Sequence, residues 1–335
     1  MNSYLSSIAP AFANHLWQST VFALVVWALT WMLRDNPARI RHALWRATSV
    51  KFLLPFSLLV SLGDLLPHTK PPIAPAVYST MDVVEQPFSD VVLPAVVQVV
   101  HSPSLRERIA AIAPACLGVL WLLGAGTVLL MWWNRWRSVA SLLRQATPAS
   151  EGRELVILRR TEASFGGAGR KPLDLRLSAE RMEPSLFGIF RPALVWPMQL
   201  SPRLDDEHIE TIFAHELTHV KRSDNLTAAL HMLVEAIFWF HPLVWWMDRQ
   251  MVTEREQACD EAVVEMGGDA GAYAESLLKT CRFCIESALP CISGVTGADL
   301  KKRTMEIISQ RASLNMTWTK KLLVGVAAIC VLAPQ

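Results

Sequence analysis

The segment His215-Glu216-Leu217-Thr218-His219 decides how the rest of this sequence is interpreted. It has the pattern H-E-x-x-H, and on a helix two histidines four residues apart project from the same face. That spacing suits two imidazoles that share one tetrahedral zinc ion. Glu216 then lies where a carboxylate can accept a proton from water at the metal. The pattern predicts a catalytic zinc site on His215 and His219, with Glu216 as the general base.

A helix start signal precedes this segment. Ser201 and Pro202 are followed by an acidic run, Asp205 to Glu207, and the N-terminal end of a helix favours negative charge. A chance match of H-E-x-x-H is rare inside a segment with such a signal. We therefore prefer a zinc site to a coincidental pattern.

A catalytic zinc ion needs one more protein ligand and an open position for water. The downstream candidates are His231, His241, Glu254, Glu256, Asp260 and Glu261. Residues 226–247 form a largely apolar run that is long enough to cross a bilayer, but a break at Pro242 permits a helical hairpin instead. The returning helix would bring Glu256 to the zinc helix, whereas His231 and His241 would lie on the outgoing helix or at the turn. We predict Glu256 as the third ligand.

Two carboxylates are predicted to orient these ligands. Asp260 follows Glu256 by one helical turn and shares its face, and Asp224 follows His219 by five residues. Carboxylates that accept a hydrogen bond from a ligand histidine fix the orientation of its ring. Cys259, beside Asp260, is expected to be a packed small residue and not a ligand.

Short strands are predicted upstream of the zinc helix. Residues 155–158 and 173–177 show β-branched content and alternation, and 186–196 is a third candidate, interrupted by Gly188 and Pro192. Proline favours an edge strand, and an edge strand can hold an extended peptide through main-chain hydrogen bonds. The expected substrate-binding residues on this strand are Leu186, Phe187, Gly188 and Ile189.

The composition favours a membrane protein with a substantial part outside the lipid. Of the 335 residues, 52% are hydrophobic and only 19% are charged, below the roughly 25% of a typical soluble domain. These values exclude a disordered chain and a coiled coil. The net charge of +2 predicts no nucleic-acid partner, since phosphate binding needs a clustered basic surface. Apolar runs predict bilayer-spanning helices at 16–33, 44–66 and 109–133 and the start of a fourth at 320–335.

Basic residues set the predicted orientation. Five Lys and Arg lie in 34–51 and 24 from Arg135 onward, against three in 64–108. We therefore expect a multi-pass protein of the cell membrane, with its N-terminus and a loop at about 67–108 outside. The expected organisation is three transmembrane helices in 1–133, a cytoplasmic-facing zinc protease domain in 134–319 with a membrane-associated hairpin at about 226–262, and the beginning of a fourth transmembrane helix in 320–335.

Four blocks resemble the BlaR/MecR-type integral-membrane zinc peptidases. They are His215–Asn225, Phe238–Trp246, Glu256–Asp260 and, before the zinc helix, Pro184–Pro197. The resemblance implies a gluzincin: an α-helical membrane protein with an inserted α+β zinc protease domain facing the cytoplasm. It also implies Zn²⁺ held by the two histidines and Glu256, and proteolysis of the chain itself or of a transcriptional repressor in signal transduction.

The sequence departs from that family at the sensor. Its antibiotic-sensing members carry a penicillin-binding domain with a Ser-x-x-Lys nucleophile, and no Ser-x-x-Lys followed by Lys-Thr-Gly occurs here. We therefore do not assign β-lactam sensing to this chain. The expected partners are the lipid bilayer, a protein substrate, and either a second copy of the chain or a separate sensor protein.

Two alternatives stay open. One is a non-proteolytic signalling or scaffold protein with a structural zinc ion, and the other is a housekeeping membrane zinc protease of the prenyl-protein or heat-shock type. Glu216 argues against the first, because a structural site does not need a carboxylate beside an open coordination position. The Glu-x-x-Cys-Asp form argues against the second.

Three further features are interpreted from the sequence. Cys281, Cys284 and Cys291 lack a nearby fourth ligand and are expected to be reduced thiols. The run Lys301–Arg303 is expected to anchor the chain at a membrane interface. Tyr273 is a candidate donor to an oxyanion.

Overall fold

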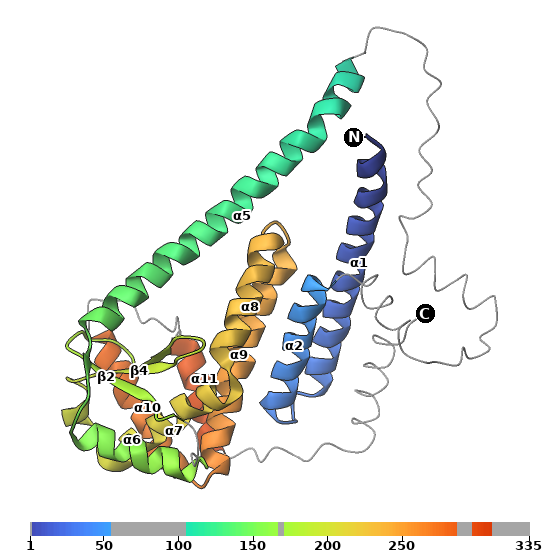
Figure 1. Ribbon diagram of the computed structural model, residues 1–335. Helices are drawn as coiled ribbons and strands as arrows, with labels where there is room; N and C mark the ends of the chain where they lie inside the picture. The colour runs from blue at the N-terminus through green and yellow to red at the C-terminus, as the bar shows by residue number, and fades with distance from the viewer. Residues whose placement is uncertain (1, 55–104, 167–170, 287–296, 310–335) are drawn as a thin grey trace.

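The computed structural model describes residues 2–54, 105–166, 171–286 and 297–309. Within these ranges the chain is mostly helical and contains one small sheet (Figure 1). The predicted external loop up to residue 104, the later part of the predicted span 44–66, Cys291 and the predicted fourth transmembrane helix lie outside the described residues.

Among the described residues, the N-terminal part contributes the helices α1 (Asn2–Met32), α2 (Ala38–Leu53) and α5 (Leu105–Gln145). Among the described residues, the segment Ile112–Gln145 of α5 is long and apolar enough to cross a membrane. Its apolar side chains are largely exposed, with Leu122 and Leu123 among them. Helix α5 also continues through residues 134–145 without a break.

A helical hairpin packs beside α1 and α2 (Figure 1). It consists of α8 (Asp224–Ile237) and α9 (Pro242–Glu265). Proline suits the first position of a helix because the N–H that it lacks would have no intrahelical partner there, so α9 starts at Pro242. The buried apolar residues between these helices are Ala23, Val26, Trp45, Phe52, Val234, Phe238, Val244, Met247 and Met251. This core fixes the path of α9, which carries Glu256.

The four strands form a mixed sheet in the order β1-β2-β4-β3. They are β1 (Thr147–Pro148), β2 (Asp174–Ser178), β3 (Ser185–Phe187) and β4 (Ala193–Pro197). Strands β2 and β4 are parallel, with Leu175 opposite Leu194, and each outer strand is antiparallel to its neighbour. Strand β4 is buried along its whole length, whereas β3 forms an edge.

Two of the strand predictions need correction. Residues 155–158 belong to helix α6 (Arg153–Ser164), which buries Ile157, Leu158 and Thr161. The spacing of these three residues is helical. In a run this short, the apolar pattern of a buried helix cannot be told from that of a strand. The prediction for 173–177 is confirmed, because β2 covers nearly the same residues.

The segment 186–196 forms parts of two strands and not one. Gly188 has a φ of +94°, a conformation that residues with a Cβ atom rarely adopt. The chain reverses after this glycine, and β3 pairs with β4 so that Leu186 lies opposite Leu194. Strand β3 is therefore the edge strand, and Pro192 lies in the turn before β4.

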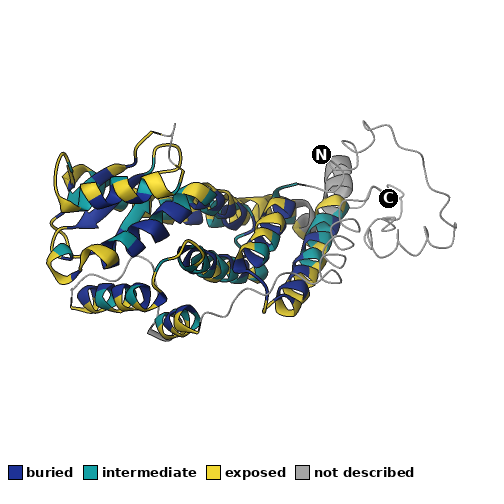
Figure 2. Ribbon diagram, turned by 90° about the horizontal axis from the view of Figure 1, so that it is seen from below, coloured by how far each residue is buried: buried dark blue, intermediate teal, exposed yellow. Residues whose placement is uncertain are grey.

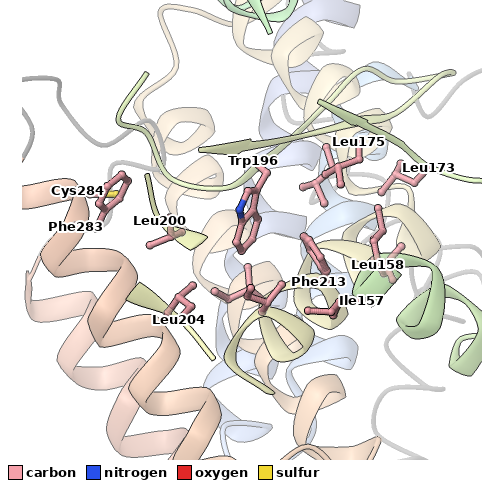
Figure 3. Close-up of a cluster of buried hydrophobic side chains, with 14 residues drawn as sticks. Ile157, Leu158, Leu173, Leu175, Trp196, Leu200, Leu204, Phe213, Phe283 and Cys284 are labelled. Carbon is pink, nitrogen blue, oxygen red and sulfur yellow. The ribbon is translucent and has the colours of Figure 1, made fainter. Parts of the chain in front are cut away.

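A hydrophobic core under the sheet holds the helix with the H-E-x-x-H segment, α7 (Asp206–Arg222) (Figure 3). The rings of Trp196 in β4 and Phe213 in α7 have centroids 4.8 Å apart, and the Trp196 indole N–H donates to Ser201 Oγ at 2.8 Å. Helices α10 (Ala270–Ile285) and α11 (Gly297–Ile308) pack on the same unit. Figure 2 shows that the helices turn their buried faces inward and leave their outer faces exposed.

Candidate metal centre

Capping residues define both ends of α7. The predicted start at Ser201 and Pro202 forms the short turn η1 (Ser201–Arg203), and α7 itself begins with a capping box between Asp205 and His208. At the other end, Ser223 has a φ of 56° and is the sole non-glycine residue with a positive φ among those described. This left-handed residue ends α7, and α8 begins at once with Asp224.

The three predicted ligands meet between α7 and α9. His215 Nε2 lies 3.2 Å from His219 Nε2 and 3.5 Å from Glu256 Oε2, and His219 Nε2 lies 3.9 Å from Glu256 Oε1. Ligand atoms at roughly 2.0–2.1 Å from a tetrahedral zinc ion are about 3.3 Å apart. The donor set and its spacing therefore fit a zinc ion between these side chains.

Each histidine contacts a carboxylate through its other ring nitrogen. Asp224 Oδ2 is 2.8 Å from His219 Nδ1, and Asp260 Oδ1 is 3.3 Å from His215 Nδ1. A carboxylate in this position accepts the Nδ1 proton and leaves the Nε2 lone pair for a metal. Asp224 reaches His219 because the left-handed turn at Ser223 redirects the chain; on a continuous helix a residue five positions on lies on another face.

Tyr273 of α10 completes the contacts around His215. Its hydroxyl donates to Asp260 Oδ1 at 2.7 Å and lies 2.8 Å from His215 Nδ1. Burial, reinforced by the negative charge of Asp260, holds the pKa of Tyr273 well above its usual value. The hydroxyl proton is thus engaged by Asp260, so Tyr273 orients Asp260 and His215 in this structure. Its role as an oxyanion donor stays a prediction.

Two arginines hold the carboxylates of the centre. Arg303 of α11 donates to both oxygens of Asp260 at 2.8 Å, and its Nη1 lies 3.5 Å from Glu256 Oε2. Arg255 Nη2 donates to Glu256 Oε1 at 3.0 Å. The expected position of Arg303 at a membrane interface is wrong, because only 11% of its side chain is exposed. No local pattern marks this residue, since its partner Asp260 lies 43 positions earlier.

The charges in the cluster favour a cation between the ligands. Burial alone would raise the pKa of Glu256, but His215, His219 and the two arginines outweigh it and hold that pKa well below its usual value. Burial would lower the pKa of His215, yet Asp260 and Glu256 raise it to about 10. Positive charge is therefore stabilised at the position that a metal ion would occupy.

Glu216 lines a cleft of about 220 Å³ beside the ligands. Its carboxylate makes no hydrogen bond or ion pair within the described residues. Burial raises the pKa of Glu216, and the charges of His219 and His215 offset part of that rise. The carboxylate is thus free to accept a proton from water in the cleft.

Strand β3 forms one wall of the same cleft. Leu186 and Phe187 line it, whereas Gly188 and Ile189, which were predicted with them, lie after β3 and do not line it. Asn225 fastens this strand to the start of α8, because its Nδ2 donates to the carbonyls of Leu186 at 3.3 Å and Gly188 at 2.8 Å. The substrate-binding role of the strand stays a prediction.

The competing ligand candidates have other partners. His231 Nδ1 lies 2.9 Å from Ser49 Oγ, and His241 Nε2 lies 3.2 Å from Thr20 Oγ1. Glu254 accepts from Arg41, and Glu261 accepts from the N–H of Ala38. Cys259 is fully buried, and its Sγ lies 3.4 Å from His219 Nδ1, the nitrogen that faces Asp224.

Two helical histidines and a glutamate from a second helix match the metal-donor set of a metallopeptidase, and the carboxylate beside the first histidine matches its general base. Residues 11–307 match the family described as BlaR1 peptidase M56, and the chain belongs to that family. It is 38% identical over 82 residues to the regulatory protein BlaR1 of Bacillus licheniformis, which covers 24% of this chain and 14% of the relative. It is 30% identical over 112 residues to the methicillin resistance mecR1 protein of Staphylococcus aureus, which covers 33% of this chain and 19% of the relative. The matched segments thus span less than a fifth of these relatives.

The contacts of Arg303 predict that it controls metal affinity. Arg303→Gln should weaken zinc binding by about 10- to 100-fold, the usual effect of removing a group that orients a ligand, because Asp260 loses its two-point partner. Competition with a coloured chelator measures this change in the purified protein. Lys302→Gln is the matched control, since Lys302 is exposed and pairs with Glu306. Equal zinc affinity in the Arg303 and Lys302 variants would contradict the assignment.

Proposed function

We propose that this chain is a zinc endopeptidase that cleaves a protein substrate, either the chain itself or a transcriptional repressor, in signal transduction. The observation that carries the proposal is one cleft lined by His215, His219, Glu256, Glu216 and the edge strand β3. Membership of a peptidase family supports the activity. The names of the relatives, a regulatory protein and a resistance protein, support a role in regulation.

The residues of the cleft suggest how the reaction proceeds. His215, His219 and Glu256 would hold Zn²⁺, which when bound would polarise a scissile carbonyl and lower the pKa of water to about 7. Glu216 accepts the proton of the attacking water and returns it to the leaving amide nitrogen. Asp224 and Asp260 keep the ligand histidines oriented throughout. The substrate lies extended along β3, whose main-chain groups supply part of its binding.

Membrane location is part of the proposal. Helix α5 supports one crossing. Helix α1 overlaps the predicted span 16–33, and α2 overlaps only residues 44–53 of the predicted span 44–66. The hairpin exposes a row of leucines on α8, namely Leu226, Leu230 and Leu233, which suits contact with lipid. We propose a multi-pass protein with an external N-terminus and with the metal centre facing the cytoplasm.

Cysteine labelling tests this orientation. In a cysteine-free background, a membrane-impermeant reagent applied to intact cells should modify Ser79→Cys, which lies in the proposed external loop. It should leave Ser201→Cys unmodified, because position 201 directly precedes α7, the helix proposed to face the cytoplasm. Permeabilised cells serve as the control, and both positions should react there. Modification of position 201 in intact cells would reverse the proposed orientation.

The two alternative functions are less well supported. A structural zinc ion would not require a cleft with an unpaired carboxylate beside the ligands, and Glu216 provides one. A housekeeping membrane protease would use the same chemistry, and it is disfavoured by the regulatory names of the relatives.

Protein termini in the native host test the proposed function. A strain with Glu216→Ala should accumulate at least one intact protein that the wild-type strain cleaves, and mass spectrometry of new N-termini identifies the cut. Overproduction of each form makes the comparison independent of the inducing signal. Identical sets of termini in the two strains would refute the proposal.

A further inference from the structure

A second cluster of metal-ligating side chains lies in the helical hairpin. His231 and Glu235 project from α8 and Asp248 from α9, and one potential ligand atom of each lies within 4.8 Å of the others. His231 is only 2% exposed and Glu235 only 5%. None of these residues contributes to the cleft that contains Glu216.

Glu235 is the unexplained member of this cluster. Within the described residues its carboxylate makes no hydrogen bond and no ion pair, and the same holds for the carboxylate of Asp248. Buried carboxylates in proteins are paired, protonated or bound to a cation. Glu235 is buried and Asp248 is half-buried, so two unpaired carboxylates that meet across the helical hairpin offer a binding position for a cation.

His231 is oriented as a metal ligand would be. Its Nδ1 lies 2.9 Å from Ser49 Oγ of α2, so an Nδ1–H group can donate to this hydroxyl. Its Nε2 faces α9 and lies 3.3 Å from the Val244 carbonyl, beyond the usual N–H···O range of about 2.7–3.2 Å. A ligand histidine typically donates its distal N–H to a fixed acceptor and keeps the other nitrogen for the metal.

We propose that His231, Glu235 and Asp248 bind a second divalent transition-metal ion. One imidazole and two carboxylates suit Zn²⁺ or Mn²⁺ better than Mg²⁺ or Ca²⁺, which prefer oxygen ligands alone. A single shared proton would neutralise only one of the two carboxylates, whereas a divalent ion neutralises both.

This ion would join three helices, one of which is α9, the helix that carries Glu256. It bridges α8 and α9, and Ser49 connects its histidine to α2. Asp248 precedes Glu256 by eight residues on α9, which is about 12 Å along the helix. The second ion would therefore hold the helix that presents the third ligand, Glu256, to α7.

Zinc content of the full-length protein in detergent tests the proposal. With Zn²⁺ as the probe, the wild type should hold about two ions per chain after gel filtration, and Asp248→Asn and Glu256→Ala should each hold about one. The double variant His215→Ala/His219→Ala should keep one ion, and adding Asp248→Asn should remove it. Glu265→Gln, which removes an exposed carboxylate from the same helix, is the control and should leave the zinc content unchanged.

Glu235→Gln separates a bound ion from a bound proton, because the amide has nearly the same shape as the protonated acid. We expect this variant to lose the second ion. A wild type with no more than one zinc per chain would overturn the proposal, and so would a Glu235→Gln protein with an unchanged zinc content. Neither result would affect the proposed peptidase, which depends on the ion at Glu256.

Discussion

Replacing Glu256 with alanine is expected to remove zinc from the candidate metal centre and to abolish proteolysis. Two histidines alone hold zinc weakly and leave its geometry undefined. The structure adds a second reason, because Arg255 and Arg303 lie 3.0 Å and 3.5 Å from the Glu256 carboxylate. Without that carboxylate both guanidinium groups would face the metal position and repel a cation.

The measurement is zinc content together with cleavage of the identified substrate, made in an Asp248→Asn background so that only this centre is counted. In the same background, His231→Ala and His241→Ala should retain the zinc ion at this centre, because these histidines lie outside the cleft and contact Ser49 and Thr20. A zinc-replete Glu256→Ala protein, or a folded His241→Ala protein without zinc, would show that the third ligand is wrongly assigned.

The sequence allowed the residues of the candidate metal centre to be predicted where regular helices bring them together. The helix pattern places His215 and His219 on one face, and the break at Pro242 lets α9 return with Glu256 and Asp260 on a shared face. These inferences needed only helical periodicity and one break. The roles of these side chains stay predictions, whereas their proximity is a property of the fold.

Contacts between distant helices could not be predicted in this way. Arg303 belongs to a basic run that resembles a membrane anchor, and only the packing of α11 brings it to Asp260. Tyr273 likewise depends on how α10 lies beside α7. The contact of Asp224 with His219 depends on a single backbone conformation, the left-handed Ser223, for which the sequence offers no strong signal.

The fold connects the helical bundle to the metal centre through α9. The first half of this helix contributes Val244, Met247 and Met251 to the core shared with α1 and α2, and its second half carries Glu256 and Asp260. Because α9 is one continuous helix of 24 residues, a displacement at the bundle end moves the third ligand and its neighbour together. A displacement of the helical bundle would thus reach the candidate metal centre through a single helix.

Glu216→Ala is expected to have the second large effect, and it separates chemistry from metal binding. Because the Glu216 carboxylate has no hydrogen-bond partner among the described residues, its removal leaves no buried group unpaired, and the fold and the zinc at His215, His219 and Glu256 should persist. Cleavage should fall by about 10²–10⁴-fold, the usual contribution of a positioned general base. Zinc analysis and single-turnover cleavage of the purified variant measure the two quantities separately.

Glu216→Gln is the matched variant, because it keeps the size of the side chain while it removes the basic oxygen. It should be as inactive as Glu216→Ala, since the other carboxylates that line the cleft, those of Glu183 and Glu256, already have partners. Loss of zinc in both variants would make Glu216 a ligand and not a base. Undiminished cleavage in both would show that Glu216 is not the general base, because no step of the reaction would then depend on the one carboxylate that, among the described residues, lines the cleft without a partner.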